Sequence, residues 1–344
     1  MELLQVKGVS KQMGAGGGAS AGAGGGLTTG TGGGVTAGAG GVTQIDFTQQ
    51  KGQKIGLAGA TGSGKSTLLK LIAGLVQPDA GEIRFEGRRV PGPLETLIPG
   101  HREIAYLSQH FELWNNYKVK EILDYANELS AEEAAALYEI GRIDHLLGRR
   151  TDQLSGGERQ RIALVRLLVR LPRLLLLDEP FSNLDRVHRD TLRAVIRDIG
   201  QNLGISCILV SHDPQDVLSW ADEILVLKAG RLIQRGAPER IYRHPVDEYT
   251  AGLFGKYNLL DPALTARVGR LAGADDSGKS LLVRPEKLVL SAMGNPAALG
   301  KVVGVTFLGP YYEIEVEMAG ARLLVRSEMN SFQAGQTVYL GLAP

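Results

Sequence analysis

The hydrophobic positions of the chain change their spacing across a glycine-rich stretch, GATGSGKST. Before this stretch, Ile55 and Leu57 alternate with other residues, as in a strand. After it, Leu68, Leu69 and Ile72 recur at helical spacing. The pattern therefore predicts a strand, a tight loop and a helix in that order.

A second apolar run, LLLLDEP, covers residues 174–180 and ends in two acids. It predicts a buried strand that delivers Asp178 and Glu179 to the carboxyl edge of a parallel sheet. The alternative is a strand followed by a solvated acidic turn. The preceding stretch has helical patterns, and Ser130 with Glu133 predicts a capping box at a helix start.

Near the end of the chain, short alternating strands are separated by glycine turns. The sequence thus predicts an α/β domain over residues 1–245 with a helical subdomain inserted at about 110–170. A linker is expected over residues 246–279, followed by a small all-β domain over residues 280–344.

Composition favours two globular domains, because 344 residues with 43% hydrophobic positions can bury a full core. The formal charge of +1 is spread along the chain, which argues against a nucleic-acid partner. Cys207 lies in an apolar run, which favours a buried, inert thiol in a reducing compartment. No run approaches ~18 apolar residues and no signal peptide is evident, so any work at a membrane must use a partner.

The stretch GATGSGKST has the pattern of a phosphate-binding loop. Its glycines let the backbone fold around an anion at the start of a helix. Lys65 is then expected to reach the β and γ phosphates, and the hydroxyl of Ser66 to ligate Mg²⁺. The expected nucleotide-binding residues of this loop are Gly59, Ala60, Thr61, Gly62, Ser63, Gly64, Lys65, Ser66 and Thr67.

In two other glycine-rich stretches, the sequence indicates phosphate binding less well. Residues 14–41 repeat about every eight positions and contain no lysine, which favours a flexible linker; a loose glycine-rich strand stack or an engineered insertion are the alternatives. Residues 273–280 fit the phosphate-loop pattern but carry Asp275 and Asp276, where polyphosphate would sit. We interpret this third stretch as a surface hairpin turn.

The acids and the segment LSGGERQR add chemistry to the phosphate loop. Asp178 is expected to hold Mg²⁺, directly or through water, and Glu179 to orient or deprotonate an attacking water. Ser155 and Glu158 predict a capping box that opens a helix. This glycine-rich helix start is also an anion site without a lysine of its own, so it could complete a site on another molecule.

Together these motifs resemble the ATP-binding cassette family over about residues 1–260, in the family's order. The six elements that carry the resemblance are a Walker A loop at residues 59–67, a Q-loop at Gln109, the LSGGE signature at 154–158, a Walker B strand at 174–179, a D-loop at 182–185 and a switch histidine at His212.

The resemblance implies a homodimer, or a pair with another ATPase subunit, that holds two ATP molecules head to tail. Each ATP would lie between the Walker A loop of one subunit and the signature of the other. The residues implied on the signature side are Ser155, Gly156, Gly157, Glu158 and Asp185. The implied catalytic residues are Lys65, Gln109, Glu179 and His212, with Ser66, Gln109 and Asp178 at Mg²⁺. Taken alone, Gln109 is an ordinary polar residue and His212 a loop histidine.

The resemblance also places Met13 where an aromatic side chain normally stacks on adenine. A thioether can pack on a ring, but weaker stacking would lower the affinity for ATP. In the family, the inserted helices meet membrane-embedded subunits, and Phe111, Trp114 and Tyr117 could form that groove. Aromatic side chains at this spacing are also common in a core.

Residues 230–258 resemble the closing segment of importer ATPases, and RPE resembles their oligonucleotide-binding-like TOBE domain. The resemblance implies an ATP-hydrolysing importer subunit, peripheral at the cytoplasmic face of the inner or plasma membrane. Its partners would be integral membrane permeases and, indirectly, an external solute-binding protein, which largely set the solute. The alternatives are a soluble ATPase switch that acts on a cytosolic partner and an ATP-binding subunit with little turnover.

Overall fold

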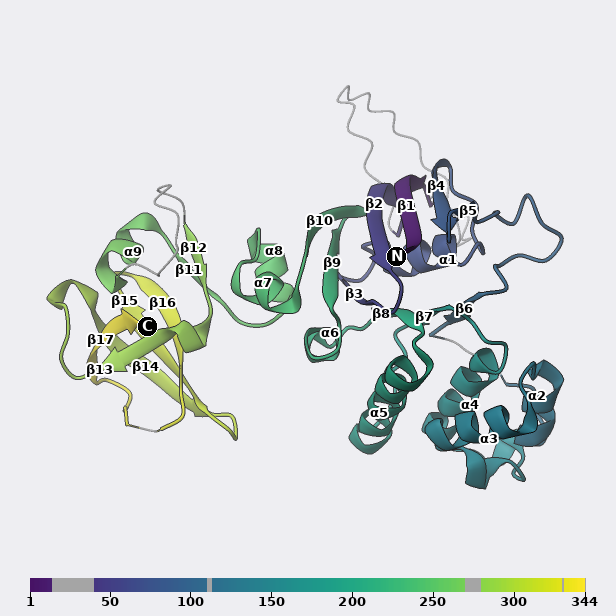
Figure 1. The fold of residues 1–344 in the computed structure, drawn as a ribbon. Coiled ribbons are helices and arrows are strands. Elements are labelled where there is room, and N and C mark those ends of the chain that lie inside the picture. Colours follow the sequence, from purple (N-terminus) through teal and green to yellow (C-terminus); the bar gives the residue numbers. More distant parts are fainter. Residues whose placement is uncertain (14–39, 110–112, 270–279, 330, 344) are drawn as a thin grey trace, which may run out of the picture. The chain divides into compact units, whose positions relative to one another are not determined.

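The computed structural model describes residues 1–13, 40–109, 113–269, 280–329 and 331–343. The chain divides into two compact units, Met1–Pro238 and Glu239–Pro344. Figure 1 shows the elements of each unit. Most of the glycine repeat and most of the third phosphate-loop pattern lie outside the described residues.

A six-stranded sheet forms the centre of the first unit. Its order is β10-β9-β3-β8-β7-β6, and only β10 runs antiparallel to its neighbour. The strands are β3 (Lys54–Ala58), β6 (Ile104–Leu107), β7 (Leu174–Asp178), β8 (Ser206–Val210), β9 (Glu223–Lys228) and β10 (Arg231–Gly236). The predicted strand–loop–helix and the predicted acidic strand are both confirmed.

Each face of this sheet contributes to a separate apolar core, because side chains alternate along a strand. Leu174 and Leu176 of β7 pack into one core, and Leu175 and Leu177 into the other. The run of leucines is therefore buried on both faces, which explains why it lacks the alternation of a surface strand.

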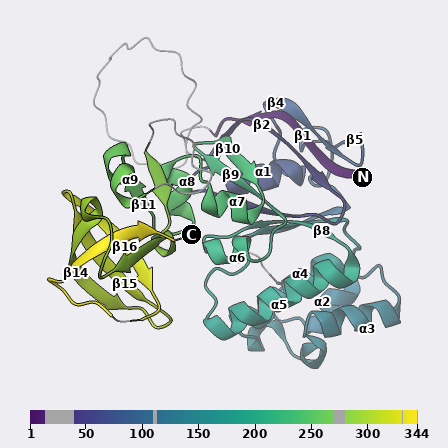
Figure 2. The same cartoon turned by 60° about the vertical axis from the view of Figure 1, so that its left-hand side comes forward.

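One face is covered by α1 (Lys65–Ile72) and by an antiparallel sheet of order β2-β1-β4-β5. Its strands are β1 (Glu2–Lys11), β2 (Val42–Gln50), β4 (Ala80–Phe85) and β5 (Arg88–Arg89). Figure 2 shows this antiparallel sheet and the helices α2 to α5 on opposite sides of the central sheet.

The helices on the other face are α2 (Val119–Ala126), α3 (Ala131–Ile140), α4 (Gly156–Leu168) and α5 (Arg186–Leu203), with short turns at Asp144–Leu146 and Thr151–Gln153. Both predicted capping boxes are present, at Ser130 and at Ser155. A short helix, α6 (Pro214–Leu218), follows β8. The helices α2, α3 and α4 form the predicted helical insertion.

The second unit contains more structure than the predicted linker. Between residues 246 and 269 lie α8 (Glu248–Leu253), β11 (Asn258–Leu260) and α9 (Pro262–Val268), and α7 (Pro238–Arg243) begins at the unit boundary. The helices α8 and α9 each start at an aspartate cap, Asp247 and Asp261 respectively. Residues 246–269, which we expected to belong to a linker, thus form two helices and a strand within the second unit.

The rest of the second unit is the predicted all-β domain. Five antiparallel strands follow the order β13-β17-β14-β15-β16, and β12 pairs with β11. The strands are β12 (Leu281–Val283), β13 (Leu288–Ser291), β14 (Leu299–Phe307), β15 (Tyr312–Met318), β16 (Ala321–Ser327) and β17 (Thr337–Leu342), with short turns at Pro285–Lys287 and Pro296–Ala298. Buried Arg284 donates to the carbonyls of Ala251, Gly255 and Lys256 and so fastens α8 to this domain.

Cys207 of β8 is fully buried, as its apolar surroundings predict. Among the described residues, no helix is long and apolar enough to cross a membrane.

Candidate nucleotide site

The phosphate loop joins the end of β3 to the start of α1. Gly62 and Gly64 have positive φ angles of 78° and 99°, which glycine adopts without strain. A Cβ at Gly59 would lie 2.4 Å from the carbonyl oxygen of Leu227, and one at Gly64 would lie 2.5 Å from that of Gly41. The loop therefore needs glycine both for its turns and for its close contact with neighbouring backbone.

Lys65 is the first residue of α1, and its side chain turns back into the loop. The ammonium Nζ donates to the carbonyl oxygens of Gly59 at 2.7 Å and Ala60 at 2.9 Å. Burial lowers the pKa of Lys65, while the nearby carboxylates of Glu179 and Asp178 act in the opposite direction. A cation thus lies beside the N-terminal end of a helix, where an anion is already favoured.

Ser66 and Asp178 meet at the carboxyl edge of the sheet. The hydroxyl of Ser66 donates to Oδ1 of Asp178 at 3.0 Å, and the hydroxyl of Tyr106 donates to Oδ2 at 2.8 Å. Tyr106 reaches this carboxylate because β6 and β7 are parallel neighbours, with Tyr106 opposite Leu176. This contact also raises the pKa of Tyr106, after the larger effect of burial.

The hydroxyl and carboxylate oxygens of this pair fit a magnesium ion. Mg²⁺ in nucleotide enzymes usually takes one or two protein oxygens together with phosphate oxygens and water. In the described part of the chain, no group of three or more His, Cys, Asp or Glu side chains could hold a metal by itself. The donor set at Ser66 and Asp178 thus suits a metal that arrives with a phosphate ligand.

Glu179 and His212 lie at the ends of β7 and β8, one strand apart. The His212 Nε2 is 2.6 Å from the Glu179 Oε1, and the Ser182 hydroxyl donates to the Glu179 Oε2 at 3.2 Å. The Glu179 amide donates to the Val210 carbonyl at 3.0 Å. The Glu179 side chain is 10% exposed and that of His212 52%, so the carboxylate lies inside and the imidazole faces solvent.

The predicted signature forms the start of α4. The Ser155 Oγ accepts from the Glu158 amide at 3.3 Å, while a Glu158 carboxylate oxygen accepts from the Ser155 amide at 2.7 Å. Ser155 and Gly156 are exposed. The helix start is therefore preformed, and it is open to another molecule.

The first turns of α5 touch both the signature and the segment after His212. Asp185 caps the helix and accepts from the His188 amide at 2.9 Å, and the hydrogen bonds from His188 lower the pKa of Asp185. Further along the helix, Arg189 and Arg193 bind Asp213 at 3.2 Å and 3.4 Å. One helix thus contacts three of the predicted motifs.

Two predicted site residues are not joined to the others. Gln109 is exposed just beyond β6, and among the described residues no hydrogen bond links it to Ser66 or Asp178. Met13 follows β1 and is 44% exposed. Phe111 lies outside the described residues. The structure therefore gathers the phosphate loop, Asp178, Glu179 and His212, and leaves the roles of Gln109 and Met13 as predictions.

The other two predicted aromatic residues do lie together, and a third joins them. The Trp114 ring is 5.6 Å from that of Tyr117 and 5.0 Å from that of Tyr125, and the Arg166 guanidinium lies 5.1 Å from the Trp114 ring. The three aromatic side chains are exposed, at 39% to 75%. They are therefore a surface group and not part of the core.

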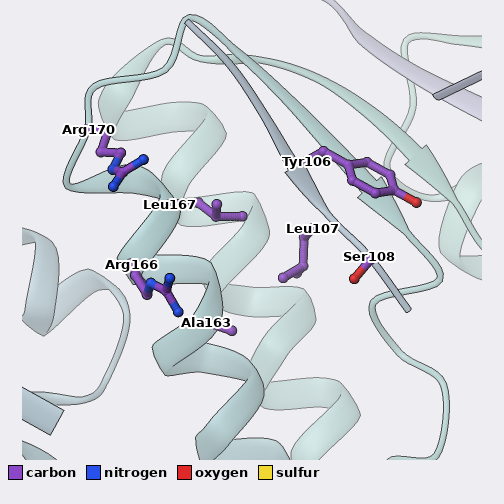
Figure 3. Close-up of a pocket in the computed structure, with 7 residues that line it drawn as sticks. All are labelled: Tyr106, Leu107, Ser108, Ala163, Arg166, Leu167 and Arg170. Carbon is purple, nitrogen blue, oxygen red and sulfur yellow. The ribbon is translucent and has the colours of Figure 1, made fainter. Parts of the chain in front are cut away.

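Beside this group, a pocket of about 170 Å³ opens between β6 and α4 (Figure 3). Its lining residues are Tyr106, Leu107, Ser108, Ala163, Arg166, Leu167 and Arg170. The lining includes Ser108, the residue before Gln109, so the pocket lies beside the carboxyl end of β6.

Sequence reasoning missed Tyr106 and His188. Tyr106 stands three residues before Gln109, but nothing local shows that it meets Asp178; only the register of β6 against β7 does. His188 falls three residues after the D-loop aspartate, at the spacing of one helical turn, and that spacing was the available signal.

One edge of the mostly parallel sheet carries the phosphate loop together with Asp178, Glu179 and His212. This arrangement defines a nucleotide-binding protein of the ATP-binding cassette class. Residues 42–182 match the family described as ABC transporter, and residues 281–344 match the TOBE domain. The chain belongs to the family of ABC transporter ATP-binding proteins and carries a TOBE domain. The predicted family and fold class are confirmed.

Similar proteins are import ATP-binding proteins for several solutes. The Fe(3+) ions import ATP-binding protein FbpC of Photorhabdus laumondii is 32% identical over 325 residues, which are 88% of this chain and 91% of that protein. The spermidine/putrescine import ATP-binding protein PotA of Mycoplasma mycoides is 30% identical over 87% of this chain and 90% of that protein. The sulfate/thiosulfate import ATP-binding protein CysA 2 of Chromobacterium violaceum is 34% identical over 83% of this chain and 82% of that protein.

Solved structures support the fold. The crystal structure of the ADP conformation of MJ1267, an ATP-binding cassette of an ABC transporter, aligns with a TM-score of 0.57 at 20% identity. The alignment covers 74% of this chain and 98% of MJ1267.

Proposed function

We propose that this protein is the ATP-hydrolysing subunit of an ABC importer and couples ATP binding and hydrolysis to solute uptake through partner permeases. One observation carries the hydrolytic part: the phosphate loop, the Ser66–Asp178 pair and the Glu179–His212 pair share one edge of the sheet. Groups suited to binding phosphate, holding a metal ion and activating water thus lie at one place. The importer part is supported by the relatives, which are named as import ATP-binding proteins.

In this proposal, the glycine loop and Lys65 hold the β and γ phosphates of ATP. The Lys65 ammonium already lies within the loop, so its charge is in place before phosphate arrives. Ser66 and Asp178, with Gln109, would hold Mg²⁺, which would neutralise phosphate charge when it is bound. Tyr106 keeps the Asp178 carboxylate turned toward Ser66.

Glu179 orients the attacking water and accepts its proton. The close contact with His212 and the hydrogen bond from Ser182 fix the carboxylate, so the attacking water meets it in one orientation. His212 lies beside it with half of its side chain exposed. From there it would contact the γ-phosphate of ATP.

The exposed start of α4 completes the site of a second subunit. Ser155, Gly156 and Gly157 present a helix N-terminus that has no lysine of its own, and Glu158 fixes its cap. Asp185 lies beside it at the start of α5. A head-to-tail dimer would therefore hold two ATP molecules, and ATP binding would close it.

The partners follow from the same proposal. Trp114, Tyr117 and Tyr125 form an exposed aromatic group on the helical insertion, which suits a helix of a membrane-embedded permease. The protein would then be peripheral at the cytoplasmic face of the membrane, with a solute-binding protein acting on the permease from outside. A soluble switch and an ATP-binding subunit with little turnover are less well supported, because the relatives are import proteins and Glu179 and His212 are paired.

The proposed dimer predicts that ATP hydrolysis by the purified full-length chain rises more than linearly with protein concentration. Each site needs two subunits, so the dimer fraction sets the specific activity. Light scattering on the same samples gives the oligomeric state. Activity that is strictly proportional to concentration, in samples that contain only monomer, would contradict the shared site.

A second prediction concerns the metal. Exchanging Tyr106 for phenylalanine removes the hydrogen bond that orients Asp178, and such a change in a ligand's support typically costs about tenfold in metal affinity. The Mg²⁺ concentration for half-maximal ATP hydrolysis should therefore rise about tenfold. The same exchange at Tyr339, on β17, is the control and should leave it unchanged. An unchanged Mg²⁺ midpoint in the Tyr106→Phe variant would show that the hydroxyl has no part in metal binding.

A further inference from the structure

His188 has contacts that the proposed mechanism does not use. It lies in the first turn of α5, and its Nδ1 is 2.7 Å from a carboxylate oxygen of Asp185. Its other ring nitrogen, Nε2, is 3.5 Å from the hydroxyl oxygen of Ser155, at the start of α4. One imidazole thus stands between a D-loop residue and a signature residue of the same subunit.

Gly157 fixes the face of this imidazole. A Cβ at Gly157 would lie 2.4 Å from Cδ2 and 2.8 Å from Cγ of His188, closer than real Cβ atoms come to a neighbour. The ring therefore packs against the backbone of the first turn of α4, in space that glycine leaves free. The signature glycine and His188 fit together, and α4 and α5 are in contact through this pair.

The contact with Ser155 affects the group that faces the second subunit. The Ser155 Oγ already accepts from the Glu158 amide, which leaves its hydrogen and one lone pair for other partners. At 3.5 Å, Nε2 is at the long limit of a hydrogen bond, and a small movement of either helix start closes or opens it. The direction of the Ser155 hydroxyl therefore depends on where His188 is held, and Asp185 holds it.

We propose that His188 is a positioning residue that couples signature Ser155 to D-loop Asp185 within one subunit. The inference rests on the proposed function, because it assumes that Ser155 contacts the γ-phosphate bound by the other subunit. Through His188, the start of α4 and the D-loop approach that nucleotide as one unit. The coupling acts on turnover and leaves the phosphate loop of its own subunit untouched.

Steady-state hydrolysis by the full-length chain tests this coupling. His188→Leu keeps the bulk of the side chain and removes both polar contacts, so kcat should fall about tenfold, as expected for a lost hydrogen bond in the reacting state. The KM for ATP should stay within about twofold, because Lys65 and its loop are unchanged. His188→Gln places an amide near the former Nε2 position and should recover most of the kcat. Wild-type turnover in the leucine variant, or a rise in KM without a fall in kcat, would overturn the proposal.

A double-mutant cycle separates positioning from a general structural effect. If His188 acts through Ser155, the kcat of Ser155→Ala should not fall further when His188→Leu is added. Losses that multiply would mean that the two residues act independently, against the proposal. His145→Leu is the matched control, since His145 is also a histidine near an aspartate, 3.5 Å from Asp144, and is exposed. Thermal unfolding midpoints identify variants that are merely less stable.

Hydrogen–deuterium exchange tests the coupling without measuring turnover. This test therefore remains valid if the proposed function fails. His188→Leu should speed exchange severalfold at the amides of residues 156–159 and of residues 186–189 together. Unchanged exchange in either segment would overturn the coupling. If Glu179→Gln hydrolyses ATP like the wild type while both segments respond to His188→Leu, the hydrolytic mechanism fails and the coupling holds.

Discussion

Exchanging Glu179 for glutamine should lower the kcat for ATP hydrolysis by roughly 10²- to 10⁴-fold, the range that a general base contributes. Glutamine has almost the same shape, but its amide cannot accept the proton of water at neutral pH. It also changes the contact with His212, whose Nε2 lies 2.6 Å from the carboxylate.

ATP binding should survive this change, because Lys65, Ser66 and the glycine loop remain. The variant should therefore hold ATP without cleaving it, and the head-to-tail dimer should accumulate. Turnover and equilibrium ATP binding, measured on the same preparation, check the loss of hydrolysis and the retained binding. Glu132→Gln, on the exposed side of α3, is the matched control and should behave as the wild type. Turnover within a few-fold of the wild type would remove Glu179 from its role.

The second large effect is expected for Lys65→Ala, which should reduce turnover by more than about 100-fold. It removes the cation that the loop holds beside the helix start, and in a partly desolvated site a charge on phosphate is worth several kcal/mol. Lys70→Ala, on the exposed side of the same helix, is the control and should keep full activity.

Gly156→Asp should inactivate the signature side to a similar extent. Within its own subunit a Cβ at Gly156 meets no atom within 4 Å, so the variant should fold, and an acid in the first helical turn is favourable. Facing a γ-phosphate, however, the new carboxylate repels it.

Mixing the two inactive variants should restore activity. In a mixed dimer, the intact loop of the Gly156→Asp subunit faces the intact signature of the Lys65→Ala subunit, so one of two sites is complete. Half of a random population is mixed, and turnover should recover to about a quarter of the wild type if sites act independently. A mixture as inactive as its components would mean that a single site cannot turn over or that the nucleotide is not shared between subunits. Exchange of subunits, followed by mass spectrometry, distinguishes these from a failure to mix.

The sequence predicted the parts of the site that lie along one strand–loop–helix. Residues 59–67 form a loop and the start of a helix within a few consecutive positions, and the apolar run before Asp178 indicates a strand by itself. The capping boxes at Ser130 and Ser155 were equally local, and both are present.

The missed residues depend on contacts between distant segments. Tyr106 and Asp178 are 72 positions apart, and only the parallel register of their strands brings them together. His188 and Ser155 belong to two helices whose packing no local pattern reveals. The helix α9 within the expected linker was missed for a different reason, because Asp261 followed by Leu264 and Val268 is a capped helix pattern that composition alone does not reveal.

The buried thiol of β8 has a practical consequence for studying dimer closure. Cys207 is the one cysteine in the chain and is fully buried, and burial raises its pKa to about 12. At neutral pH the native chain is therefore almost unreactive toward maleimides and methanethiosulfonates, which attack exposed thiolates. A cysteine introduced at any exposed position becomes the only labelled group without prior removal of native thiols. Spin labels at one such position in each subunit would then report the separation between subunits directly, from an otherwise unaltered sequence.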